Sequence, residues 1–397
     1  MYRMDVPPHR SVGAVWFAPK RGVSAGGEAR KGGCGMGPVS DVANALSVTG
    51  PRTALSRRAF GRLAAASALA VPLGTVMRSA HAADDLAAPA ILTPRTKITF
   101  IWNPAALCNV VVGVAKEQGI FDRHGLDVET IFTGTDTASI LEALALNKAQ
   151  ATSTFLLRLL KPLEAGFDVK LTSGVHAGCA YLIASRDAGI NSLQDLRGKR
   201  IGMSDLNSPM KLLYEIQFKK AGIPTNEIIW RQYPADVFVI AVQKGEIDAF
   251  ADGEPNAYYA VKRSNGKLFK LASNGEGELG NYTCCVLAIN GKLIRDNRPA
   301  ATALTRAMLE ASKLVDQDRQ IAVKAAARYS PFQAKPEELD DMIAGYPYDA
   351  HRGCPTGEEF RQHVLYFAQG LHETGILRPG TDPVRFTNLI TQDVLTS

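Results

Sequence analysis

Residues 97–132 read KITFIWNPAALCNVVVGVAKEQGIFDRHGLDVETIF, and this stretch decides the fold class. Residues 97–102 alternate in polarity as a half-buried strand does and stop at an Asn-Pro pair. Apolar side chains recur at helical spacing over residues 107–119, which end at Gly119, and residues 126–132 form a second β-branched run. A strand, a helix and a strand in this order predict a parallel sheet covered by helices.

The same alternation continues in two successive units, as expected for two lobes in a chain of 397 residues. The first unit is completed by predicted strands at 149–153 and 169–173 and helices at 135–147 and 155–165. The second unit has predicted strands at 199–203, 227–231 and 247–251 and helices at 208–221, 235–244 and 255–262.

Two extended runs flank the second unit, at residues 179–185 and 283–290. We expect them to be hinge strands that leave the first lobe and return to it side by side. The rest of the chain is predicted to be helical and to pack on the first lobe, with helices at 299–316, 320–329, 336–343 and 357–373.

Three phrases carry a family resemblance: KEQGIFDRHGLDVE at 116–129, LQDLRGKRIG at 193–202 and KGEIDAF at 244–250. In order and spacing they resemble phrases of periplasmic substrate-binding proteins for sulfonate, nitrate, bicarbonate and thiamine precursors. The resemblance implies an α/β, type II periplasmic binding protein fold. Its two lobes each hold a mainly parallel sheet flanked by helices, two hinge strands join them, and ligand lies between them.

The domain limits follow from this pattern. We expect a leader at residues 1–82, lobe 1 at 83–183 and 286–397, and lobe 2 at 184–285. The resemblance implies a periplasmic solute-binding component of an ABC importer that captures a small polar organic molecule by lobe closure. The molecule would be sulfonate-like, or nitrogen-containing and thiamine-precursor-like. Its expected partner is a transmembrane ABC permease with a cytoplasmic ATPase. We expect a monomer without cofactor and without enzyme activity.

Two alternatives remain open. Relatives of this family include enzymes, so the chain could be an exported desulfinase-like or pyrimidine-synthase-like enzyme. Cys108 would then be the nucleophile, assisted by His124, His176 or an arginine, although Cys108 is predicted to lie inside a helix among core-like neighbours. The other alternative is a sensory binding protein that presents its ligand to a membrane receptor.

The N-terminal region has the features of an export signal. Arg57 and Arg58 precede a mildly apolar run and an Ala-His-Ala cleavage sequence, which predicts twin-arginine export, cleavage near Ala82-Ala83 and a periplasmic location. Met36 is an alternative start to Met1. Residues 1–82 hold 11 Lys/Arg and 3 Asp/Glu, so the remaining chain is near −2 and its charge does not indicate nucleic-acid binding.

Ligand-binding candidates are chosen at strand ends and helix starts, where α/β proteins bind ligands. Trp102 can stack on a ring, Glu254 favours an amine or N–H donor, and residues 133–136 begin a helix. Each has a structural alternative: a core aromatic, a solvated charge or a plain helix cap. The full set is Trp102, Asn103, Thr135, Asp136, Thr154, His176, Asn207, Ser208, Glu254 and Asn256.

The cysteines leave three interpretations open. On adjacent hinge strands Cys179 could form a disulfide with Cys284 or Cys285; these thiols and His176 could bind a soft metal such as Cu(I); or the thiols are buried and inert. The sequence has no Cys-x-x-Cys or His-x-x-x-His spacing, which argues against a zinc site, and no metal is predicted.

Overall fold

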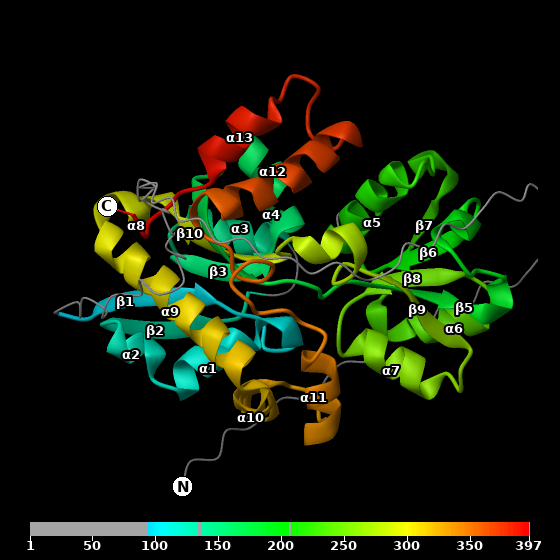
Figure 1. The fold of residues 1–397 in the computed structure, drawn as a ribbon, viewed down its shortest axis with the longest axis horizontal. Coiled ribbons are helices and arrows are strands. Elements are labelled where there is room, and N and C mark those ends of the chain that lie inside the picture. The colour runs from blue at the N-terminus through cyan, green and yellow to red at the C-terminus, as the bar shows by residue number, and fades with distance from the viewer. Residues whose placement is uncertain (1–93, 134–136, 206–207, 397) are drawn as a thin grey trace, which may run out of the picture. The chain divides into compact units, whose positions relative to one another are not determined.

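The computed structural model describes residues 94–133, 137–205 and 208–396. In these ranges the strands form two five-stranded sheets, ordered β2-β1-β3-β10-β4 and β7-β6-β8-β5-β9 (Figure 1). The first sheet contains β1 (Thr96–Ile101), β2 (Leu126–Ile131), β3 (Ala151–Phe155), β4 (Val169–His176) and β10 (Cys285–Asn290). The second contains β5 (Tyr181–Ser185), β6 (Arg200–Met203), β7 (Ile229–Gln232), β8 (Ala249–Asp252) and β9 (Leu268–Ser273).

Both sheets are mainly parallel, as predicted. In the first, β1 runs parallel to β2 and β3, in a register that joins Thr96 to Leu126 and Ile101 to Ile131. In the second, β6 runs parallel to β7 and β8. Each sheet also has one antiparallel strand inside it: β10 lies between β3 and β4, and β5 lies between β8 and β9. The predicted α/β class is confirmed.

Helices flank both sheets. On the first sheet α1 (Val110–Glu117) packs on α9 (Arg298–Gln317) and α10 (Arg319–Tyr329), and α9 contacts β4. Asn297 is the N-cap of α9, and its side chain accepts a hydrogen bond from the Ala300 N–H. The other helices of the N- and C-terminal parts are α2 (Ile120–Arg123), α3 (Thr137–Ala145), α4 (Leu156–Glu164), α8 (Gly291–Asp296), α11 (Pro336–Ile343), α12 (Gly357–Glu373) and α13 (Pro383–Ile390). The second sheet is accompanied by α5 (Pro209–Lys220), α6 (Phe238–Gln243) and α7 (Asn256–Arg263).

The chain passes between the sheets twice, from β4 to β5 and from β9 to β10. The prediction that residues 179–185 and 283–290 run side by side is wrong, because β5 pairs only within the second sheet and β10 only within the first. Strand β4, not β5, lies beside β10. A turn separates β4 from β5: Gly178 has φ 64°, and a Cβ there would lie 2.9 Å from Gly275 Cα.

Several elements differ from the sequence prediction. The helix expected from residue 107 begins with a 3-10 turn at Leu107–Asn109, and β9 and α13 were not predicted. Strand β9 reads LFKLAS, in which a lysine and a serine weaken the apolar pattern, and α13 has only eight residues. Among the described residues no helix is both long and apolar enough to cross a bilayer.

A substitution at Gly174 of β4 tests how tightly the C-terminal segment that contains Gly353 and Pro355 packs on the first sheet. An added Cβ would lie 2.5 Å from Gly353 O, 2.6 Å from Pro355 Cδ and 2.7 Å from Thr283 Oγ1. We expect Gly174→Ala to lower the free energy of unfolding by about 1–3 kcal/mol, because two of these three contacts are with backbone or a proline ring. Urea denaturation measures it. Gly380→Ala, where a Cβ meets open space, should change it by less than about 0.5 kcal/mol; equal values for both variants would contradict close packing here.

Candidate functional site

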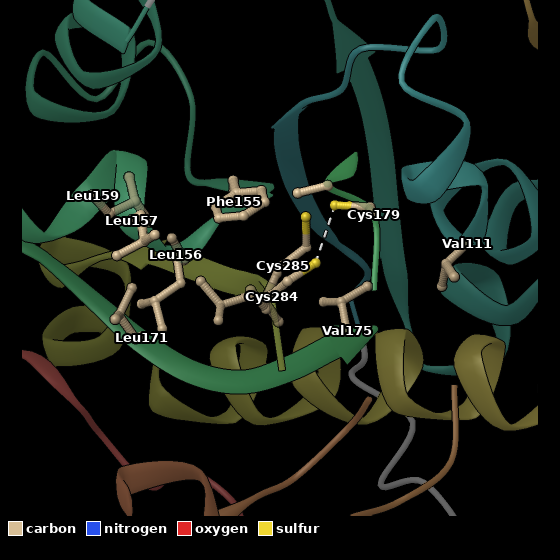
Figure 2. Close-up of a cluster of buried hydrophobic side chains, with 14 of the residues drawn as sticks. Val111, Phe155, Leu156, Leu157, Leu159, Leu171, Val175, Cys179, Cys284 and Cys285 are labelled. Carbon is tan, nitrogen blue, oxygen red and sulfur yellow. Dashed lines mark hydrogen bonds between the residues drawn. The ribbon is translucent and has the colours of Figure 1, made fainter. Parts of the chain in front are cut away.

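Five side chains from distant parts of the sequence meet where the chain passes between the sheets. We call Cys108, His176, Cys179, Cys284 and Cys285 the crossing cluster. The side-chain donor atoms of Cys108, His176, Cys179 and Cys285 all lie within 4.8 Å of one another. Cys179 Sγ is also 3.1 Å from Cys284 Sγ. Figure 2 shows the three sulfurs of Cys179, Cys284 and Cys285 grouped beside buried apolar side chains.

Pairing of β4 with β10 builds one half of this cluster. Cys285 is the register partner of His176, and the Cys284 N–H donates to His176 O at 3.0 Å. The Thr283 hydroxyl lies 3.1 Å from the same carbonyl and 2.8 Å from Gly353 O, and it can donate its one proton to only one of them. The backbone bond from Cys284 therefore fixes the start of β10 against the end of β4. The imidazole of one strand therefore lies next to the two thiols of the other.

Cys108 belongs to a segment that comes before β4 and β10 in the sequence. It lies in the 3-10 turn between β1 and α1, and its carbonyl accepts a hydrogen bond from the Tyr348 hydroxyl at 3.3 Å. The predicted core-like neighbours are confirmed, because Leu107 and Val111 are buried, but Cys108 lies in a 3-10 turn and not in the α-helix. A 3-10 turn rotates successive side chains by more than an α-helix does, and Cys108 is half-buried while Leu107 and Val111 are fully buried.

His176 is fully buried, and its two ring nitrogens have different surroundings. Nδ1 lies 3.0 Å from Ala177 O and 3.6 Å from Cys284 Sγ, whereas Nε2 has no hydrogen-bond partner. A carbonyl only accepts, so the bond to Ala177 requires the proton on Nδ1. In the neutral ring the lone pair is then on Nε2. The rings of Tyr346 and Tyr348 lie 5.7 and 5.9 Å from the imidazole, and the Tyr346 hydroxyl is a second buried group without a partner.

Interactions within the cluster shift the pKa values of its cysteines and its histidine in opposite directions. Hydrogen bonds from Cys179 and Cys285 hold the pKa of Cys108 well below its usual range, assisted by His176. Burial opposes protonation of His176, yet the neighbouring Cys284 and Cys108 sulfurs raise its pKa well above the usual value. The pKa of Cys179 is raised because it donates to Cys108 and Cys284. Neighbouring groups in the cluster thus have pKa values that are shifted in opposite directions, as in reactive and metal-binding cysteine sites.

The return strand is also held by α12. His363 Nδ1 accepts the Thr283 N–H at 3.1 Å, which requires an unprotonated nitrogen. Burial lowers the pKa of His363 despite the nearby Glu359 carboxylate. The neutral ring is therefore part of the native contact that orients the start of β10.

In the structure four residues that the sequence analysis singled out lie close together, and further residues lie beside them. His176, Cys179, Cys284 and Cys285 meet as the sequence suggested, although through β4 and not through adjacent hinge strands. All five described cysteines are free thiols, and the Cys179 disulfide stays a prediction. Sequence analysis related Cys108 to His176 only in the enzyme alternative and did not place it with the other thiols, and it missed Tyr346 and Tyr348 altogether, because no local pattern relates them to the cluster.

A second group of buried donors lies at the carboxyl end of β1 and β2. Trp102 follows β1 and is only 6% exposed, and its backbone N–H donates to Ile131 O at 2.9 Å. Its indole Nε1 has no hydrogen-bond partner. The hydroxyl of Thr133, just beyond β2, is also buried without one. The Trp102 ring meets Tyr329 edge-on at 5.2 Å, so the residue is both a core aromatic and an unsatisfied donor.

The remaining first-lobe candidates have structural roles. Asn103 accepts the Ala105 N–H at 3.0 Å in the turn after β1, and Thr154 is buried in β3 beside Val286. Predicted residues that lie outside the described part of the chain are Arg57, Arg58, Thr135, Asp136 and Asn207.

The second-lobe candidates are mostly bonded within the chain. Ser208 is the N-cap of α5 and accepts the Met210 N–H at 3.3 Å. Asn256 donates to Asp252 at 3.0 Å. Glu254 is buried, and one of its carboxylate oxygens pairs with Lys270 at 2.9 Å. Its other oxygen accepts a backbone N–H of α7.

Comparison with known proteins places the chain in a family. The family model described as NMT1/THI5 like matches residues 110–320, more than half of the chain. The chain belongs to the NMT1/THI5-like family. The NMT1/THI5-like chain is 26% identical over 227 residues to the nitrate import ATP-binding protein NrtC of Synechocystis. This match covers 52% of the chain but only 33% of NrtC, so the chain spans about a third of that relative's length.

Solved structures show which fold this NMT1/THI5-like chain has. The periplasmic aliphatic sulphonate binding protein SsuA of Escherichia coli matches with TM-score 0.60 at 16% identity, over 76% of this chain and 93% of SsuA. The periplasmic nitrate-binding protein NrtA of Synechocystis matches with TM-score 0.60 at 15% identity, over 78% of this chain and 88% of NrtA. At such identities the likeness shows the fold, and the predicted type II periplasmic binding protein fold is confirmed.

Protonation of His363 should weaken the native state. Its folded pKa lies below the ordinary value of about 6.5, so the unfolded chain binds the proton first. The contribution of His363 to stability is then complete above about pH 6.5 and falls below it, by at most about 1.4 kcal/mol per pH unit. We expect His363→Gln, which retains an acceptor, to remove this part of the pH dependence in urea denaturation between about pH 7.5 and about pH 5.5.

His372, which is half-buried and also lies in α12, supplies the control for this comparison. His372→Gln should follow the parent protein over the same range. If His363→Gln also followed the parent, the Thr283 contact would not depend on the neutral ring.

Proposed function

We propose that this chain is the periplasmic solute-binding component of an ABC importer and captures a small polar organic molecule between its two lobes. Membership of the NMT1/THI5-like family and the two-sheet fold support this proposal. Structural neighbours named as sulphonate- and nitrate-binding periplasmic proteins support it further. In the proposed mechanism, contacts that form only in the closed state shift the protein from open to closed when ligand binds.

The unsatisfied donor of Trp102 is the observation that carries the proposal. Buried polar groups in folded proteins nearly always have a partner, and an indole N–H can only donate. Trp102 Nε1 and Thr133 Oγ1 have none, and both lie just beyond the carboxyl ends of neighbouring parallel strands. Ligands of open α/β sheets bind at this edge. A ligand oxygen, as in a sulfonate or a carboxylate, is the acceptor that fits these donors.

The ion pair of Glu254 bears on the choice of ligand class. A free carboxylate would favour an amine or an N–H donor, but Lys270 already neutralises this one, and the Lys270 ammonium also lies 3.8 Å over the Tyr181 ring. We therefore favour the sulfonate-like class over the amine-containing, thiamine-precursor-like class. A monomer that docks on an ABC permease, delivered by the twin-arginine leader at Arg57 and Arg58, completes the proposal.

Ligand binding can be tested with one pair of matched variants. The purified protein should bind one sulfonate-like molecule per chain, found by thermal-shift screening of sulfonates, nitrate, aminopyrimidines and polyamines and measured by calorimetry. Trp102→Phe keeps the ring and removes the donor, so it should weaken binding about tenfold, the value of one hydrogen bond in a buried site. Trp230→Phe in β7, a tryptophan that packs on Phe218, is the control and should bind as the parent does.

Two results would count against this function. If no compound in the screen shifts the melting temperature, the solute-binding proposal fails. If Trp102→Phe binds the identified ligand as tightly as Trp230→Phe, the unsatisfied donor does not face the ligand.

A second candidate, an exported enzyme, is favoured by one observation. Cys108 and His176 lie in the same four-residue group, and the pKa of Cys108 is held low by hydrogen bonds from Cys179 and Cys285, as a nucleophile requires. The purified protein should be assayed for sulfinate hydrolysis alongside Cys108→Ser. Turnover that this substitution abolishes would favour the enzyme, whereas binding without turnover supports the solute-binding function.

A further inference from the structure

The geometry points to a metal site in the crossing cluster: Cys108, His176, Cys179 and Cys285 bind one thiophilic d¹⁰ cation, Zn(II) or Cu(I). This site is separate from the donors at Trp102 and Thr133 on which the proposed function rests. Its test reads the metal directly and does not depend on any solute.

The donor set has the composition and the spacing that such an ion needs. Three sulfurs and one imidazole are a closed Cys₃His set, and thiolates also select Cu(I). In a tetrahedral Zn(II) site with these ligands the donor atoms lie about 3.5 to 3.8 Å apart. Here all four lie within 4.8 Å of one another. Rotation of thiol side chains about χ1 closes a difference of about 1 Å without movement of the backbone.

His176 is oriented as a metal ligand is. Its Nδ1–H donates to Ala177 O, which fixes the tautomer and leaves the Nε2 lone pair available. Nε2 is fully buried and has no hydrogen-bond partner. A buried acceptor without a partner costs stability, and a cation bound at Nε2 removes that cost. This unsatisfied nitrogen is independent of the thiol spacing and points to the same occupant.

The surroundings suit a buried cation and allow it to enter. Metal binding requires deprotonated thiols, so it should strengthen as the pH rises. Three thiolates with Zn(II) leave a net charge of −1. Cys108 is half-buried while Cys179 and Cys285 are buried, so Cys108 is the ligand that meets solvent first.

Metal binding would join three segments. Cys108 precedes α1, His176 ends β4 and Cys179 lies in the passage to β5, while Cys285 begins β10. One ion would therefore tie both passages between the sheets to the first helix. The twin-arginine route predicted from the leader exports folded proteins, so the thiols would bind metal in the reducing cytosol before they meet an oxidising compartment.

The experiment uses the full chain, reduced with a phosphine under argon. Zn(II) is titrated against a chromophoric chelator, and Cu(I) against bicinchoninate in a separate arm. We expect one ion per chain in at least one arm, and the two arms identify which cation it is. Co(II) added in place of Zn(II) should give the sulfur-to-metal charge-transfer absorption and the intense visible bands of a tetrahedral thiolate site.

Matched cysteine variants locate the site. Cys108→Ser and Cys285→Ser should weaken binding by more than about tenfold. Cys354→Ser is the control, because this buried thiol donates to Val175 O at 3.0 Å and lies outside the cluster. It should bind metal as the parent does. Circular dichroism checks that each variant folds.

Three outcomes would overturn the proposal. The first is that the reduced protein binds neither Zn(II) nor Cu(I) stoichiometrically. Loss of binding because Cys179 and Cys284 form a disulfide again counts as this outcome. The second is equal affinity in Cys108→Ser and Cys354→Ser. The third, which needs no variant, is a Co(II) form of the unsubstituted protein without sulfur-to-metal absorption.

Discussion

The insertion of β10 between β3 and β4 is the constraint on which the rest of the structure depends. A central strand needs partners for its backbone on both sides, and β10 finds them only in segments that come before the second sheet in the sequence. The whole second sheet must therefore be a loop between β4 and β10. The carbonyl of His176, which accepts the Cys284 N–H, fixes the point where that loop closes.

This closure gathers polar groups in a place where burial is nearly complete. His176 and the thiols of Cys179, Cys284 and Cys285 lie there among apolar side chains. Buried groups of this kind reduce stability unless they are bonded. The cluster satisfies most of them internally, through sulfur–sulfur contacts and the bond to Ala177, and leaves Nε2 of His176 unsatisfied. Because an unsatisfied buried polar group lowers the stability of the fold, its presence marks this cluster as a place where function is expected.

Much of the fold could be predicted from the sequence, because the strands and helices follow local patterns. Strand β1, strand β2 and the C-terminal helices lie within a few residues of the predicted positions, and Ser208 caps α5 as its type and place suggested. What failed was the pairing of the hinge strands. Gly178 turns the chain between β4 and β5, and the register of β10 depends on contacts with segments more than 100 residues away, which no local pattern contains.

The sequence by itself determined the class of fold and the two successive units, because apolar periodicity and glycine positions act over short stretches, and the resemblance of three phrases indicated the family. It also indicated that His176, Cys179, Cys284 and Cys285 are unusual residues. The absence of a local Cys-x-x-Cys spacing argued against zinc, but that argument covers only sites formed within one segment. Only the tertiary structure decided that Cys108 joins His176 across 68 positions of sequence, because their meeting depends on where β1 and β4 lie in one sheet.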